Sequence, residues 1–204
     1  MLSINGISKK FDDNQLFYHF DLQIEKGDFV IITGESGCGK TTLLNMIGSI
    51  EVPDEGDIVY KGKSIFDSKN QPIYLREEVG FLFQNFALIE AKTVLQNFKL
   101  IKEKSRSGMK WEEALNFVNL PESVLNRKIY TLSGGEQQRV AIARLLIKKC
   151  NLILADEPTG SLDKENAEGI FSLLNGLNQT GKTIVMVTHD TDLASRGKRW
   201  IRLS

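Results

Sequence analysis

The sequence predicts an α/β fold with a mostly parallel sheet, a smaller antiparallel β-layer and an inserted α-helical lobe. Three β-branched apolar runs are typical of buried strands: "FVIITG" from Phe29, "NLILADEP" from Asn151 and "KTIVMVTHD" from Lys182. Helical patterns separate these runs, as in a parallel sheet that helices cover on both faces. The stretch from Met1 to Gly27 and "GDIVYKGKSI" from Gly56 contain short strands with turn residues, and they predict the antiparallel layer.

The predicted lobe begins after these first strands, because residues 85–127 have a helical pattern. One helix face in "WEEALNFV" is formed by Trp111, Ala114, Leu115 and Val118. This spacing predicts that Trp111 packs in the core of the lobe. The later run "RVAIARLLIKK" is apolar almost all round, which predicts a largely buried helix.

Composition limits the class of protein. The 204 residues suffice for one domain with a sizeable core, and the net charge is zero, so no nucleic-acid partner is expected. A local basic cluster without interleaved aromatics indicates a solvated face: Lys102, Lys104, Arg106 and Lys110. No apolar run approaches the roughly 20 residues of a spanning helix, so any membrane part is expected from another chain. Two cysteines and no secretory apolar run at the start predict a cytosolic setting.

A glycine-rich loop predicts a phosphate site. Residues 34–41, "GESGCGKT", fit G-x-x-x-x-G-K-[ST] between a predicted strand and a predicted helix. The glycines let backbone N–H groups approach phosphate oxygens, Lys40 adds a positive charge and Thr41 offers a hydroxyl to Mg²⁺. The loop therefore predicts a P-loop NTPase (RecA-like) core. Kinases, GTPases and transport ATPases all share this loop, so it leaves the nucleotide and the reaction open.

Two adjacent acids end the second buried strand. Asp156, placed beside the P-loop, can hold Mg²⁺ through its water shell, and Glu157 can orient or deprotonate an attacking water. The alternative for adjacent acids is a solvated turn, but the apolar strand before them favours a site. The guanine-reading Asn-Lys-x-Asp element of GTPases is not visible in the sequence.

The stretch "LSGGEQQR" from Leu132 predicts a second anion site. Ser133 and Glu136 have the spacing of a capping box, and Gly134 and Gly135 leave the first backbone N–H groups of the next helix accessible. The P-loop already surrounds its own phosphates, so a second site in one chain has no phosphate of its own. The simplest resolution is that it completes the site of another copy, and that two chains enclose two nucleotides head to tail.

These motifs together resemble the ATPase subunit of ABC transporters. The resemblance rests on "GESGCGKTT", "LSGGEQQR", "LILADEPTGSLD" and "VTHD" in this order, and it covers essentially the whole chain. It implies one ABC ATPase domain over residues 1–204. Residues 1–84 and 150–204 would form the ATP-binding core with its β-layer, and residues 85–149 the helical lobe with the signature motif.

The resemblance also implies roles for single residues. Gln84 corresponds to the glutamine that senses Mg²⁺ and the attacking water, Asp163 to the loop aspartate that links the two sites of a dimer, and His189 to the switch histidine. Phe11 stands where the family has an aromatic residue, usually tyrosine, that stacks on adenine, and packing in the core is its alternative role. His19 has no such context and is expected at the surface.

The complete set of expected site residues follows from the motifs and the resemblance. The expected catalytic residues are Glu157, His189, Gln84 and Lys40. The expected ATP-binding residues are Phe11, Gly34, Glu35, Ser36, Gly37, Cys38, Gly39, Lys40, Thr41 and Thr42. The expected signature residues, acting on the ATP of the partner subunit, are Ser133, Gly134, Gly135 and Glu136, with Asp163 in the dimer loop. The expected Mg²⁺ residues are Thr41, Gln84 and, through water, Asp156.

The expected function is ATP hydrolysis that drives a separate membrane permease from the cytoplasmic face of the membrane. "LREEVGFLFQNFALIEAKTVLQNF" resembles the branch for lipoprotein release, macrolide and antimicrobial-peptide export and cell division, and the Lys- and Asn-rich composition resembles Gram-positive bacteriocin exporters. The implied cofactors are ATP and Mg²⁺, and the implied partners are a second copy and a permease. Two alternatives stay open: an ATP-driven dimerising regulator of a membrane partner, and a soluble ABC-type ATPase acting on ribosomes or DNA.

Overall fold

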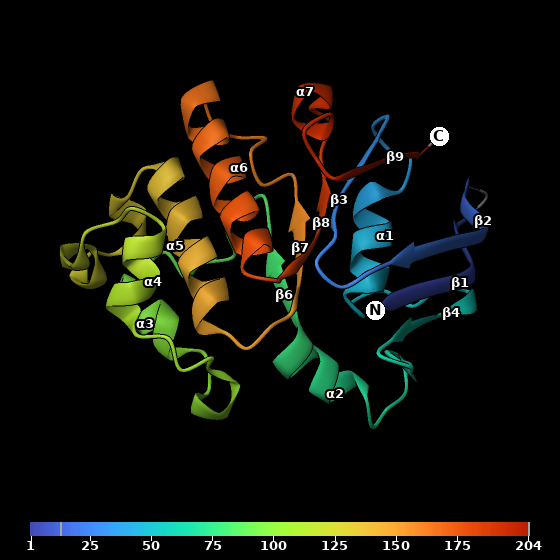
Figure 1. The fold of residues 1–204 in the computed structure, drawn as a ribbon, viewed down its shortest axis with the longest axis horizontal. Helices are drawn as coiled ribbons and strands as arrows, with labels where there is room; N and C mark the ends of the chain where they lie inside the picture. Colours follow the sequence, from blue (N-terminus) through green and yellow to red (C-terminus); the bar gives the residue numbers. More distant parts are fainter. Residues whose placement is uncertain (13, 204) are drawn as a thin grey trace.

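The computed structural model describes residues 1–12 and 14–203, and it contains two sheets with helices around them (Figure 1). One sheet has five strands, all parallel where paired, in the order β6-β7-β8-β3-β9. The other has four antiparallel strands in the order β2-β1-β4-β5. Both predicted layers are therefore confirmed.

The parallel sheet forms because its strands are apolar on both faces. Its strands are β3 (Phe29–Gly34), β6 (Val79–Leu82), β7 (Leu152–Asp156), β8 (Thr183–Val187) and β9 (Arg199–Leu203). Side chains alternate between the faces of a strand. Phe29 and Ile31 thus join the core beneath the helices α5 and α6, whereas Val30 and Ile32 join the core around α1 and the antiparallel sheet.

The antiparallel sheet lies at the end of the molecule away from the lobe (Figure 1). Its strands are β1 (Leu2–Phe11), β2 (Asn14–Ile24), β4 (Glu55–Tyr60) and β5 (Lys63–Ser64). The expectation of short strands before Gly27 is wrong, because β1 and β2 have 10 and 11 residues. Register shifts between Ile4 and Lys10 interrupt their pairing, and such irregularities let a turn-rich sequence continue as one strand.

Seven α-helices lie within the described residues. They are α1 (Lys40–Ile47), α2 (Gln71–Ile73), α3 (Val94–Lys99), α4 (Trp111–Phe117), α5 (Gly134–Ile147), α6 (Lys164–Gln179) and α7 (Thr191–Ala194). A π-helical segment, Tyr74–Glu78, follows α2, and the region between α3 and α5 also contains short 3₁₀ turns. None of these helices is long and apolar enough to cross a membrane.

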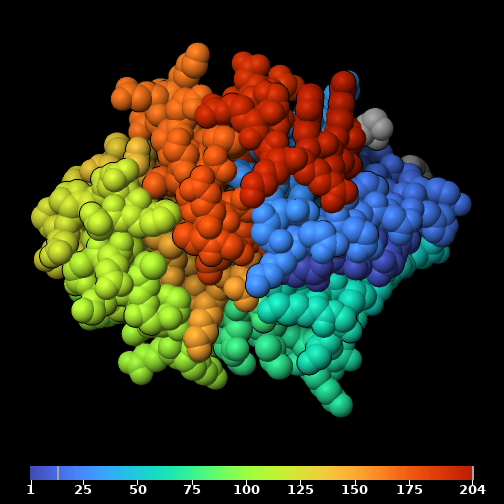
Figure 2. All heavy atoms as spheres, viewed as in Figure 1, coloured from blue at the N-terminus to red at the C-terminus, as the bar shows by residue number. Residues whose placement is uncertain are grey.

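The helical lobe occupies one side of the molecule, shown in yellow-green in Figure 2. The predicted apolar face of α4 is fully buried at Ala114, Leu115 and the C-cap residue Val118. Trp111 stacks on Phe98, with ring centroids 5.9 Å apart, as the helix pattern predicts. Helix α5 is largely buried and packs between the lobe and the sheet. The lobe and one face of the sheet share one apolar core. The boundaries between the ATP-binding core and the lobe, after residue 84 and before residue 150, stay a prediction.

Candidate active site

The P-loop connects the carboxyl end of β3 to the first turn of α1. Gly37 and Gly39 have φ of 84° and 93°, a region that side chains rarely adopt, so glycine is required at both turns. A side chain at Gly34 would approach Cys38 Sγ and the carbonyl oxygen of Leu203 to 2.5 and 2.7 Å. The loop is thus closely packed against β9 and cannot accept larger residues at these glycines.

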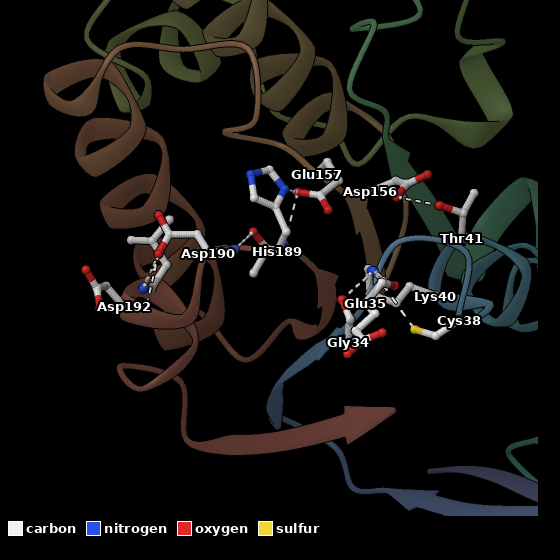
Figure 3. A network of polar contacts seen from close by, with 12 residues as sticks. Gly34, Glu35, Cys38, Lys40, Thr41, Asp156, Glu157, His189, Asp190 and Asp192 are labelled. Atoms are coloured by element: carbon white, nitrogen blue, oxygen red, sulfur yellow. Dashed lines mark hydrogen bonds and ion pairs between the residues drawn. The ribbon is translucent and has the colours of Figure 1, made fainter. Parts of the chain in front are cut away.

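Lys40 folds back over this loop (Figure 3). Its Nζ donates to the carbonyl oxygens of Gly34 and Glu35, each at 2.8 Å, and lies 4.0 Å from Cys38 Sγ. These contacts hold the ammonium group at the mouth of the loop, where an anion would meet it.

Thr41 and Asp156 meet across the end of the sheet. Thr41 Oγ1 donates to Asp156 Oδ1 at 3.1 Å (Figure 3). Burial raises the pKa of the Asp156 carboxyl, and the hydrogen bond from Thr41 offsets this only in part. Asp156 also lines a cavity of about 450 Å³ together with Gln84 and Ser161. This set offers only oxygen ligands and an amide, which fits Mg²⁺, a cation that takes few protein ligands and keeps water and phosphate oxygens.

Glu157 and His189 form a second pair beside the first. Glu157 has φ of 44°, and its backbone N–H donates to the Val187 carbonyl oxygen at 3.0 Å, so the turn after β7 is fixed to β8. Its Oε2 lies 2.9 Å from His189 Nδ1 and accepts from the His189 backbone N–H at 3.3 Å (Figure 3). Asp190, which caps α7 through the backbone N–H groups of Asp192 and Leu193, fixes the loop that carries the histidine.

The signature turn has the predicted capping box. Ser133 Oγ accepts from the Glu136 backbone N–H at 3.2 Å, and Glu136 Oε2 accepts from the Ser133 backbone N–H at 2.8 Å. Gly134 is exposed, but Gly135 is buried, and a Cβ there would lie 2.6 Å from Asn166 Oδ1. The expectation that both glycines serve only a ligand is therefore incomplete, because packing inside the chain already requires glycine at Gly135.

Asp163 begins helix α6. Its Oδ1 accepts from the Asn166 backbone N–H at 2.9 Å and its Oδ2 from the Asn166 side-chain amide at 2.7 Å. These hydrogen bonds lower the pKa of the Asp163 carboxyl. The residue is exposed and acts as a helix cap in one chain, and its role across a dimer stays a prediction.

Phe11 lies at the end of β1 with 47% of its side chain exposed, and Lys9 Nζ stands 5.1 Å from its ring centroid. The exposure excludes the alternative of a core residue, and stacking on adenine stays a prediction. His19 is exposed, as expected.

The basic cluster is mostly exposed. Lys102, Lys104 and Lys110 are exposed, but Arg106 is half-buried over the Trp111 ring. The prediction of a solvated face is therefore wrong for Arg106.

The expected site residues form separate groups in one chain. Thr41 joins Asp156, Glu157 joins His189, and Asp163 reaches Gly135 through Asn166. Among residues 1–12 and 14–203, no hydrogen bond or ion pair connects the signature turn to the P-loop. The two predicted anion sites are therefore not joined to each other within one chain.

Two polar residues of α5 escaped the sequence analysis. Gln138 is fully buried and donates to the Pro158 carbonyl oxygen at 2.6 Å. Arg144 donates to the carbonyl oxygens of Ala87 and Phe86 at 2.5 and 3.2 Å. Arg144 interrupts the apolar run of α5, which is a signal, whereas Gln138 lies among polar residues and gives none; the distant partners of both cannot be read from local spacing.

Comparison with known proteins agrees with this geometry. Residues 17–160 match the ABC transporter family model. The chain is 40% identical over 214 residues to LolD, the lipoprotein-releasing system ATP-binding protein of Bacteroides fragilis, covering 100% of this chain and 97% of LolD. It is 39% identical over 212 residues to MacB, the macrolide export ATP-binding/permease protein of Bdellovibrio bacteriovorus, covering all of this chain but only 32% of MacB.

The fold is similar to that of MJ0796 of Methanocaldococcus jannaschii, an ABC transporter cassette whose dimeric structure gives a TM-score of 0.87 at 38% identity. That likeness covers 100% of this chain and 94% of the MJ0796 chain. A second MJ0796 dimer, in a post-hydrolysis state bound to ADP and Pi, gives a TM-score of 0.85 at 37% identity. The chain therefore belongs to the ABC transporter family and is an ATPase subunit of its LolD, MacB and MJ0796 branch.

Proposed function

We propose that two copies of this ATPase subunit enclose two ATP molecules head to tail, and that their hydrolysis drives a separate membrane permease. The observation that carries the proposal is the separation of the two anion sites. The P-loop and the Glu157–His189 pair lie at one edge of the sheet, whereas no hydrogen bond or ion pair among the described residues joins the Ser133 cap to them. A second copy supplies the missing half of each site.

In this proposal the P-loop and Lys40 bind the phosphates of ATP. The ammonium group exchanges the carbonyl oxygens of Gly34 and Glu35 for phosphate oxygens, so it is already placed near the ligand. Thr41 and Asp156 would hold Mg²⁺, with Gln84 at the same cavity, and the bound ion neutralises charge on the phosphates. The exposed ring of Phe11 stacks on adenine.

Glu157 then acts on the attacking water. It accepts a proton as the water oxygen forms a bond to the γ-phosphorus, and the bond from that phosphorus to the β,γ-bridging oxygen breaks to give ADP and inorganic phosphate. His189 orients the Glu157 carboxylate and contacts the γ-phosphate. The partner subunit's signature turn, through Ser133 and Gly134, donates to the same γ-phosphate, while Asp163 links the two sites.

The permease and its cargo form the finer part of the proposal. LolD belongs to a lipoprotein-releasing system and MacB to macrolide export, which supports export of a peptide, a lipoprotein or an apolar drug-like molecule. Bacteriocin export is one such case. The subunit would then lie on the cytoplasmic face of the membrane, attached to its permease.

The first experiment measures ATP hydrolysis by the purified protein with Mg²⁺, alone and after reconstitution with the proposed membrane permease. Hydrolysis that rises more than linearly with protein concentration supports a dimer that forms the sites. Activity that the permease and a transported peptide stimulate favours transport. Activity that the permease changes without any cargo moving across a vesicle membrane favours the regulator instead.

A further inference from the structure

Helix α5, which begins with the signature turn, is tied to the two loops that carry the catalytic side chains of its own chain. Gln138 reaches the loop of Glu157, and Arg144 reaches the loop of Gln84. We propose that Gln138 and Arg144 are positioning residues, through which contact of α5 with the partner's nucleotide sets the loops of Glu157 and Gln84. This inference rests on the proposed head-to-tail dimer.

The Gln138 contact is buried and specific. Its side-chain amide has no solvent exposure, and Nε2 donates to the Pro158 carbonyl oxygen at 2.6 Å. The Oε1 of the same amide has no hydrogen-bond partner among the described residues. A buried oxygen without a partner destabilises the fold, so stability alone gives no reason for a glutamine here. What the amide provides is a fixed link to the residue that follows Glu157.

Arg144 forms the second link. Its guanidinium donates to two successive carbonyl oxygens, of Phe86 and Ala87, and forms no ion pair with a described carboxylate. Burial without such a partner lowers the pKa of the guanidinium. The guanidinium is half-buried and hydrogen-bonded to these two backbone oxygens, so it favours one geometry of the loop, because a shift of the loop breaks both hydrogen bonds.

Both links end at strained backbone. Glu157, next to Pro158, has φ of 44°, and Phe86 and Ala87 have φ of 61° and 47°. Residues with side chains adopt this region at a cost, so the loops keep these conformations only while neighbouring contacts hold them. A small movement of α5 can therefore change how each loop presents its side chain, Glu157 in one case and Gln84 in the other.

The start of α5 completes the connection. A Cβ at Gly134 would lie 3.7 Å from Leu162 and 3.9 Å from Phe86, so the signature turn lies beside the loop after Glu157 and the loop after Gln84. The N-terminal turn of α5 is also where the proposed dimer places the partner's γ-phosphate. One helix thus contacts the partner's nucleotide at its end and its own catalytic loops along its length.

The test compares Gln138→Met and Arg144→Met with a matched control, Arg139→Met. Arg139 lies on the same helix and donates to the Val118 carbonyl oxygen in the lobe, away from both loops. For each protein, kcat and KM for ATP, the affinity of the isolated subunit for a fluorescent ATP analogue, and Tm are measured. Gln138→Met and Arg144→Met should lower kcat about tenfold to a hundredfold, because a misplaced catalytic group costs about that much.

The affinity of the isolated subunit should stay within about twofold of the wild type, because neither residue touches the P-loop. Arg139→Met should keep its kcat even if its Tm falls. Arg144→Lys should recover most of the rate, since a lysine can donate to two carbonyl oxygens, as Lys40 does in this chain. If Arg144→Met does not fold, the kcat of Gln138→Met still decides the test.

The outcomes separate the two proposals. If the wild-type protein hydrolyses ATP only as a dimer, and Gln138→Met and Arg144→Met keep its kcat, this inference alone is overturned. An equal loss of kcat in Arg139→Met also overturns it, because the helix would then need only its packing. A wild-type protein that hydrolyses ATP as a monomer overturns the head-to-tail dimer, and this inference with it.

Discussion

Glu157 Oε2 and His189 Nδ1 lie 2.9 Å apart at the carboxyl ends of the adjacent strands β7 and β8. The parallel register places the two residues side by side, although 32 positions separate them in the chain. The hydrogen bond from the His189 backbone to the same carboxylate oxygen fixes the carboxylate twice. In the proposed mechanism, replacing the histidine side chain removes one of these two hydrogen bonds and a contact to the γ-phosphate, and it leaves the P-loop free to bind the nucleotide.

Lys40→Ala should reduce both ATP affinity and turnover. In the proposed site the ammonium group binds phosphate in the ground state, and a hydrogen bond to a charged group is worth about 1.5–3 kcal/mol, so affinity should fall about tenfold or more. Titration of the isolated subunit with a fluorescent ATP analogue measures this. Unchanged affinity would mean that residues 34–41 do not hold the phosphates.

Ser133→Arg should leave ATP binding by the isolated subunit intact and abolish hydrolysis by the dimer. The larger side chain would occupy the space of the partner's γ-phosphate and would also remove the Oγ that caps α5. Mixing Ser133→Arg and Lys40→Ala subunits should restore one working site per mixed dimer. If Ser133→Arg alone keeps the wild-type rate, the signature turn does not act on a nucleotide.

Gly135→Ala should destabilise the fold by about 1–3 kcal/mol, since its Cβ would lie 2.6 Å from Asn166 Oδ1 and overpacking has that cost. The double variant Gly135→Ala/Asn166→Ala lacks the Asn166 side chain that the new Cβ would meet, so it should recover the Tm. Turnover then shows whether the site also needs glycine there. A Tm loss that the second substitution does not relieve would refute the packing explanation.

Cys38 should react with a maleimide in the nucleotide-free protein, and MgATP should protect it. Cys38 is half-buried in the P-loop, whereas Cys150 has 2% exposure and donates to the Leu145 carbonyl oxygen. Burial also raises the pKa of the Cys150 thiol, which leaves less of the reactive thiolate. Peptide mapping after a short pulse separates the two thiols. Equal labelling of Cys38 with and without MgATP would contradict a loop closed around the nucleotide.

Local patterns were enough to predict three strands of the parallel sheet and the phosphate loop. β3, β7 and β8 follow from apolar β-branched runs, and the P-loop from its glycine and lysine spacing. The contact between Glu157 and His189 was not predicted: the resemblance gave a role for His189, but no local spacing shows which strands become neighbours. Gly135 was explained only by ligand access, since Asn166, its neighbour in space, lies on another helix.

The hydrogen bonds from Gln138 and Arg144 of α5 to distant loops escaped prediction for the same physical reason. An arginine within an apolar helix signals a partner, but the carbonyl oxygens of Phe86 and Ala87 are backbone groups that any residue carries. Their positive φ is equally invisible in the sequence, because neither is a glycine. Strain of this kind is set by tertiary contacts and appears only in the folded chain.

The most direct test of the head-to-tail ATPase is the mass of Glu157→Gln in the presence of MgATP, measured by gel filtration with light scattering. The amide keeps the shape of the side chain but cannot accept the proton from water, so turnover should fall at least about a hundredfold while ATP stays bound. Trapped ATP should then hold two chains together, giving the mass of a dimer that dissociates when nucleotide is removed. A Glu157→Gln protein that binds ATP and stays monomeric at all concentrations would contradict the account.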